Sequence, residues 1–117
     1  MRTLRALTLA ALVVPTAAPA QVDTEQAQGL LREAVVEAFR SVDCVAVYTS
    51  DFLITAFYNK MDAIAEKKFE AAGLDFPTST DDRDAAYLPV FGALYDEGLI
   101  IEEQGGDVER FPSACEG

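Results

Sequence analysis

Carboxylates are the side chains through which this chain could perform acid–base chemistry. Its 117 residues include 20 Asp and Glu but no His, so the commonest general base in enzymes is missing. Glycoside hydrolysis needs only two carboxylates. Asp43 and Asp51 are the candidates, because each lies in an apolar stretch where burial would raise its pKa. We favour the simpler interpretation that each places negative charge at a helix start, after Ser41 and Ser50.

Other residues typical of active sites and metal sites form no recognisable motif. The four serines lie outside Gly-x-Ser-x-Gly and Ser-x-x-Lys sequences, and there is no glycine-rich phosphate loop. Asp81, Asp82 and Asp84 lack the alternating order of a calcium loop and are better explained as the start of a helix. We therefore expect a non-catalytic protein without a cofactor or a metal site.

Cys44 and Cys115 are the only cysteines. A redox pair normally has the spacing Cys-x-x-Cys, and a zinc site needs more ligands than two cysteines in a chain without histidine. The remaining interpretation is a structural disulfide between Cys44 and Cys115, which would join the C-terminal segment to the helical part of the chain.

Residues 1–20 have the order of a secretory signal peptide. Arg2 and Arg5 form a basic start, an apolar run follows, and small residues at positions 18 and 20 fit cleavage between Ala20 and Gln21. The run is too short for a transmembrane helix, so we expect no stable membrane span after cleavage. The predicted product is a single small domain, residues 21–117, located in the periplasm or secreted, where oxidising conditions favour a disulfide.

Helical periodicity organises the first half of this domain. A helix is expected at residues 25–39, capped by residue 23 or 24. The apolar residues 42–58 predict a central core helix that continues to a glycine end at Gly73. It would be one long helix, or two helices with a break near Tyr48, where Ser50 could cap the second.

The last third of the chain changes from helical to strand-like spacing. A helix is expected from the Asp81 cluster to Gly98, with Pro89 either bending it or marking its first turn. Residues 99–104 and 107–111 then predict a β-hairpin around a two-residue turn, Gly105-Gly106. The expected fold is thus mainly α: a small bundle of three to four helices with a C-terminal β-hairpin, joined by one disulfide.

A helix that ends in residues 94–100 and is followed by a hairpin resembles the last part of a winged-helix domain. The resemblance covers about a quarter of the chain and rests on a common arrangement of elements. It implies a DNA-recognition helix and a wing, but these segments carry mainly Asp and Glu, with Arg83 and Arg110 as their only cations. This negative charge would repel the phosphates of nucleic acid, so we infer no nucleic-acid binding. The same arrangement of elements could instead bind a protein.

The overall charge narrows the choice of partner. The formal net charge is −11, and it becomes −13 when residues 1–20 are removed, because they contain two Arg and no carboxylate. Such a surface repels nucleic acid and anionic lipid, and suits a partner with a basic face. We predict that the protein binds another envelope or secreted protein as an accessory subunit, inhibitor or immunity-type partner. The alternatives are a periplasmic acid-stress chaperone, which it resembles in size, helicity and single disulfide, and a carboxylate-based hydrolase.

Overall fold

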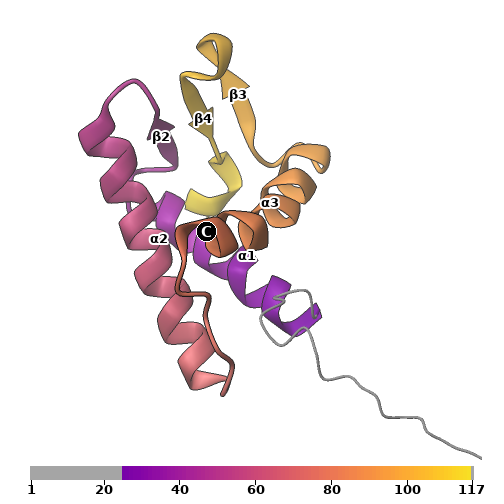
Figure 1. The fold of residues 1–117 in the computed structure, drawn as a ribbon. Helices are drawn as coiled ribbons and strands as arrows, with labels where there is room; N and C mark the ends of the chain where they lie inside the picture. Colours follow the sequence, from indigo (N-terminus) through magenta and orange to yellow (C-terminus); the bar gives the residue numbers. More distant parts are fainter. Residues whose placement is uncertain (1–24, 117) are drawn as a thin grey trace, which may run out of the picture.

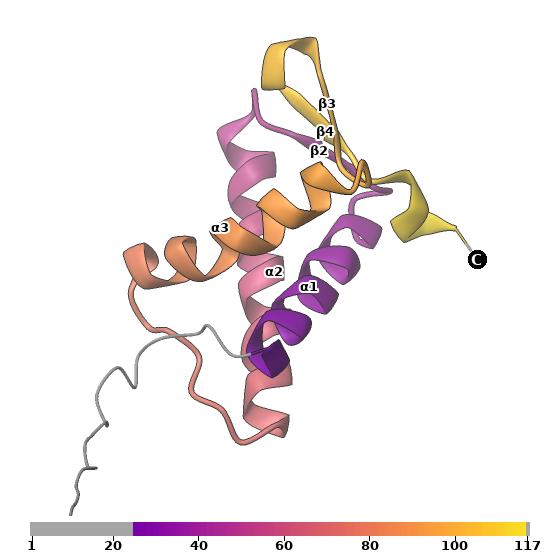
Figure 2. The ribbon, with the colours of Figure 1, turned by 90° about the vertical axis from the view of Figure 1, so that its right-hand side faces the viewer.

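The computed structural model describes residues 25–116. The predicted signal peptide, its cleavage between Ala20 and Gln21, and the helix cap at residue 23 or 24 lie outside the described residues. Three helices, α1 (Glu25–Arg40), α2 (Asp51–Ala71) and α3 (Thr80–Asp96), pack around one another, and a three-stranded sheet covers one end of the bundle (Figures 1 and 2). The predicted mainly α fold with a C-terminal hairpin is confirmed.

Helix α1 forms where the sequence predicts it and provides one wall of the core. Its apolar residues return every three or four positions, so one face of the helix is buried along its whole length. The buried residues of α1 are Ala27, Leu31, Ala34, Val35, Ala38 and Phe39. The other face is polar: Arg32 pairs with Glu97 just beyond α3, and Glu37 pairs with Lys68 of α2.

The second predicted helix is correct only in its later part. Residues 45–47 form a strand, β2 (Val45–Val47), and α2 begins at Asp51, where the Ser50 side chain accepts a hydrogen bond from the Leu53 amide. The predicted break and the Ser50 cap are therefore confirmed, but both the continuous helix and a first helix before the break are wrong, because residues 45–47 form a strand. Left-handed backbone at Asp43 and Cys44, with φ of 56° and 63°, ends the helical path before β2.

Helix α2 also differs from the expected core helix in its first half. Phe57, Met61, Ala65 and Phe69 recur at every fourth position and are buried, which places one stripe of the helix in the core. Phe52, however, is 80% exposed, and Leu53 and Tyr58 are also exposed. Residues 52–58 are therefore apolar on two faces of α2, and only one of these faces packs against the core.

Helix α3 begins and ends as expected. The Ser79 side chain caps it by accepting from the Asp82 amide at 3.1 Å, and Gly98, with φ of +74°, ends it. Pro89 lies inside the helix on an exposed turn rather than starting a shorter helix.

The sheet joins the hairpin to the strand between α1 and α2. Strands β3 (Ile101–Glu103) and β4 (Val108–Arg110) form the hairpin, and the order β2-β4-β3 places β4 in the middle with antiparallel neighbours on both sides. The predicted two-residue turn is wrong: because Glu103 pairs with Val108, the loop spans residues 104–107. Gln104 adopts positive φ along with both glycines, which forms the wider turn.

The disulfide between Cys44 and Cys115 is present, with a Cα–Cα distance of 6.1 Å. It joins the turn after α1 to a short 3-10 helix, η3 (Pro112–Cys115). Two hydrogen bonds reinforce the join: the Phe111 amide donates to the Cys44 carbonyl at 2.9 Å, and Arg40 Nε donates to the Ala114 carbonyl. Within residues 25–116, no helix has both the length and the apolar character needed to cross a membrane.

Candidate functional site

The two carboxylates suggested by the sequence do not form a site. Asp43 lies in the left-handed turn before β2 and Asp51 in the first turn of α2, and both are exposed. The interpretation as a helix-start charge is confirmed for Asp51 and wrong for Asp43, because a strand follows Asp43. Neither residue lines the cleft described next.

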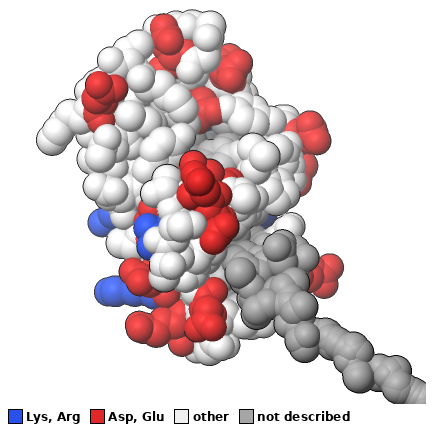
Figure 3. Space-filling model, viewed as in Figure 1, with Lys and Arg blue, Asp and Glu red and all other residues white. Residues whose placement is uncertain are grey.

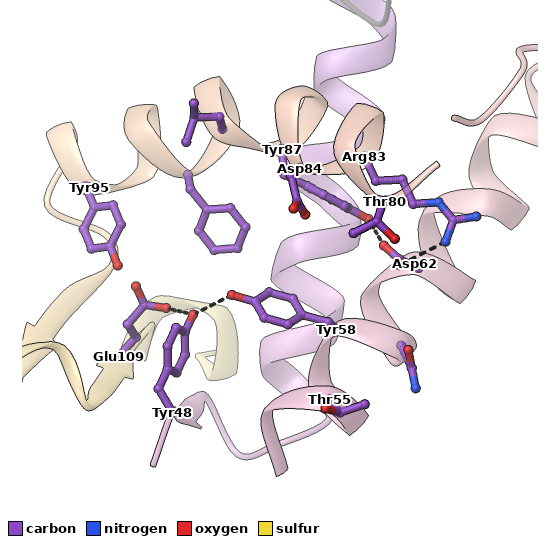
Figure 4. A pocket seen from close by; sticks show the side chains of 13 residues that line it. Tyr48, Thr55, Tyr58, Asp62, Thr80, Arg83, Asp84, Tyr87, Tyr95 and Glu109 are labelled. Carbon is purple, nitrogen blue, oxygen red and sulfur yellow. Dashed lines mark hydrogen bonds and ion pairs between the residues drawn. The ribbon is translucent and has the colours of Figure 1, made fainter. Parts of the chain in front are cut away.

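A cleft of about 690 Å³ lies between the first half of α2, helix α3 and strand β4 (Figure 4). Its lining combines aromatic, apolar and acidic side chains. The lining residues are Tyr48, Thr55, Tyr58, Asn59, Asp62, Thr80, Arg83, Asp84, Tyr87, Leu88, Phe91, Tyr95 and Glu109.

Glu109 is the most unusual residue of the cleft, because it is an acidic side chain that is only 5% exposed. It lies on β4, whose central position in the sheet leaves neither edge free, and its register partner on β2 is the small residue Ala46. The Tyr48 hydroxyl donates to Glu109 Oε1, and the Tyr58 hydroxyl donates to that of Tyr48 at 3.4 Å. A chain of two tyrosines thus connects the buried carboxylate to the exposed side of α2.

Burial changes the acid–base behaviour of this chain of groups. Desolvation raises the pKa of Glu109 above its ordinary value, and the hydrogen bond from Tyr48 offsets only part of the effect. Burial also raises the pKa of Tyr48, as does its hydrogen bond to Glu109. Tyr48 therefore keeps its proton at neutral pH and remains a hydrogen-bond donor.

A second carboxylate in the cleft, Asp62 of α2, has both a cationic partner and a hydrogen-bond donor. Arg83 Nη1 lies 3.3 Å from Asp62 Oδ2, and the Tyr87 hydroxyl donates to Oδ1 at 3.1 Å. Arg83 also donates to the Pro77 carbonyl at 2.7 Å and lies over the Phe76 ring. This cluster joins α2, α3 and their connector, so its role is structural.

Apolar side chains form the rim of the cleft. Leu88 of α3 is 73% exposed, and Tyr58 on the opposite wall is also exposed. Phe91 and Tyr95 are half-buried along the same helix as Leu88. Exposed apolar groups around a concave, partly polar surface are typical of a binding site.

The surface around the cleft is acidic. Figure 3 shows carboxylates over the hairpin tip, over the start of α3 and at the lower end of the bundle, whereas Lys and Arg gather beside α2. Helix α3, the hairpin and the residues between them carry exposed Asp84, Asp96, Glu97, Glu102 and Asp107. No group of three or more His, Cys, Asp or Glu within residues 25–116 is placed to hold a metal ion.

Replacing Glu109 with glutamine tests its burial through the pH dependence of stability. Because the pKa of Glu109 is higher in the folded than in the unfolded state, the folded state binds the extra proton. Its contribution to stability is therefore fully present below the unfolded pKa and is lost as the pH rises through the folded pKa. We expect Glu109→Gln to melt at a higher temperature than the natural protein at pH 7, and the difference to shrink towards pH 4.

Thermal unfolding followed by circular dichroism at several pH values measures this difference. The control is Glu66→Gln, which removes an exposed carboxylate of α2 and leaves Glu109 in place. A Glu109→Gln variant whose melting temperature follows the natural protein at every pH would contradict the assigned burial of the charge.

The chemistry available to the cleft follows from these groups. It offers a buried carboxylate as an acceptor of hydrogen bonds or positive charge, tyrosine hydroxyls as donors, and aromatic faces as apolar contacts. Comparison of the chain with protein-family models, with curated proteins and with solved structures found no match.

Proposed function

We propose that this chain is a non-catalytic exported protein that binds another envelope or secreted protein through the cleft between α2, α3 and β4. The observation that carries the proposal is the composition of this cleft: exposed apolar residues such as Leu88 and Tyr58 surround an acidic interior. Exposed apolar side chains around a concave surface with a few polar groups are typical of binding sites.

Charge specifies the kind of partner. With a formal net charge of −11 for the whole chain, and carboxylates around the cleft, a partner with a basic face would be attracted and an acidic one repelled. The disulfide is compatible with an extracellular location, and the predicted signal peptide makes the periplasm our proposed site of action.

One observation weighs against the alternative of an acid-stress chaperone. Such a protein would need protonation to loosen its packing. Protonation of Glu109, the most buried carboxylate of the described residues, favours the folded state, whereas protonation of the exposed Glu97, whose pKa is lowered by Arg32, opposes it. Binding a partner, in contrast, gives the exposed apolar rim a purpose at neutral pH.

A photo-crosslinking residue placed at Leu88 tests the proposed function in the native host. The rim position should yield one discrete crosslinked protein in the envelope fraction. The same residue at Glu70, exposed near the far end of α2, should not yield it. Equal products from both positions, or none from Leu88, would contradict binding through the cleft.

The crosslinked partner then allows the role of charge to be measured. We expect its association rate with this protein to fall as salt increases, over the range where the Debye length shrinks from about 10 Å to about 3 Å. Asp84→Lys, which reverses a charge lining the cleft, should slow association more than Asp81→Lys, the same change outside the lining. Stopped-flow measurements provide both comparisons, and a rate independent of salt and of Asp84 would show that charge does not select the partner.

A further inference from the structure

Glu109 is a buried charge without a countercharge. Each of the five ion pairs within residues 25–116 uses another carboxylate. The nearest cation in sequence, Arg110, pairs with Glu103 instead, at 2.8 Å. A buried carboxylate held by one tyrosine hydroxyl opposes folding, and such groups in clefts are frequently retained because they bind something.

The orientation of Glu109 indicates where a ligand would meet it. Oε1 accepts the hydrogen bond from Tyr48. In Figure 4 the other carboxylate oxygen carries no interaction with the residues drawn and points towards Tyr95 of α3, which also lines the cleft. An acceptor oxygen is therefore presented to whatever enters from the rim.

The walls around this oxygen favour one type of cation. Tyr58 and Tyr95 both line the cleft, and aromatic rings attract cations over their faces. An arginine guanidinium is planar, stacks on aromatic rings, and is more weakly hydrated than a lysine ammonium, so it is the cation best suited to a buried ion pair. Asp84, exposed in the same lining, adds negative potential at the entrance.

We propose that Glu109 is the anchor of the cleft and receives an arginine side chain from the partner protein, with apolar neighbours of that arginine lying on Leu88 and Phe91. This inference rests on the proposed function, because it names the residue type through which the partner binds. The arginine would supply the countercharge that Glu109 lacks. It would also lower the pKa of Glu109, since a nearby cation favours the ionised carboxylate.

Two matched peptides test the anchor directly. The first is acetyl-Leu-Arg-Leu-amide; the second has citrulline in place of arginine, which keeps the shape but removes the charge. In NMR titrations of the full-length oxidised protein, the arginine peptide should bind about tenfold or more tightly than the citrulline peptide. It should also move the Glu109 carboxyl resonance and lower its pKa.

Variants separate this result from a structural effect. Glu109→Gln, expected to fold at least as stably as the natural protein, should bind both peptides equally weakly, and Glu66→Gln should retain the preference for arginine. The anchor is refuted if the natural protein binds the two peptides equally, or if Glu109→Gln keeps the preference.

The partner crosslinked at Leu88 distinguishes the two proposals. If Glu109→Gln weakens that partner's binding by about tenfold or more, the anchor is supported. If the partner binds Glu109→Gln unchanged, the arginine anchor fails while the proposed function stands. If the arginine peptide binds but no partner crosslinks, the proposed function fails, and this inference fails as a description of a protein interface.

Discussion

Replacing Phe39 with alanine is expected to lower the free energy of unfolding by about 3–5 kcal/mol. Phe39 is fully buried, and its ring makes edge-to-face contacts with two other rings. The ring centroids are 4.9 Å apart for Phe57 of α2 and 5.4 Å apart for Phe111, which follows β4. One side chain thus connects α1, α2 and the sheet. Because a domain of this size has a total stability on the order of 5–15 kcal/mol, the variant should be close to unfolding.

Phe52→Ala is the matched control for this prediction. Phe52 is 80% exposed at the start of α2, so the same truncation should change stability by about 0.5 kcal/mol or less. Urea unfolding of both variants, followed by circular dichroism, gives the two free energies. Similar losses for Phe39→Ala and Phe52→Ala would contradict the placement of Phe39 at the centre of the core.

Loss of the disulfide is expected to lower the melting temperature by about 10–30 °C, which corresponds to about 2–4 kcal/mol in a domain of this size. The cysteines are 71 positions apart, and the loop-entropy model gives about 4.4 kcal/mol for a loop of that length. The effect should fall on the C-terminal segment first, because the disulfide holds η3 against the end of α1.

The measurement compares the oxidised protein, the reduced protein and the double variant Cys44→Ala with Cys115→Ala. Reduced and double-variant proteins should melt at similar temperatures, well below the oxidised protein. Unchanged melting on reduction would indicate that the hydrogen bonds to Cys44 and Ala114 hold the segment without the covalent bond.

Local signals predicted the helices of this fold well. Ser50 and the glycines at 73 and 98 mark helix ends by mechanisms that act within one turn of chain. Strand β2 was missed as a strand because residues 45–47 are as apolar as a core helix, and their pairing with β4 involves residues more than sixty positions away. Such tertiary pairing overrides local propensity.

The site was harder to predict than the fold. The sequence indicates Asp43 and Asp51 as candidate site residues because their neighbours in sequence are apolar, yet both side chains are exposed in the structure. Glu109 lies between Val108 and Arg110 in a segment that looks like an ordinary solvent-exposed strand. Its burial follows from side chains on distant segments, such as Tyr48, that lie against it in the folded chain. Such contacts leave no signal in the sequence near residue 109.

If the chain is exported through a channel amino end first, as we propose, the position of β4 in the sheet also bears on how it would mature. The middle strand is the last of the three to appear, so β2 and β3 have no partner until residues 108–110 arrive. Cys44 would then cross the membrane as a free thiol, 71 positions ahead of the cysteine with which it pairs. During that interval it would be open to exchange with existing disulfides, which forms mixed disulfides, and maturation would depend on the oxidoreductases of the compartment that the chain enters.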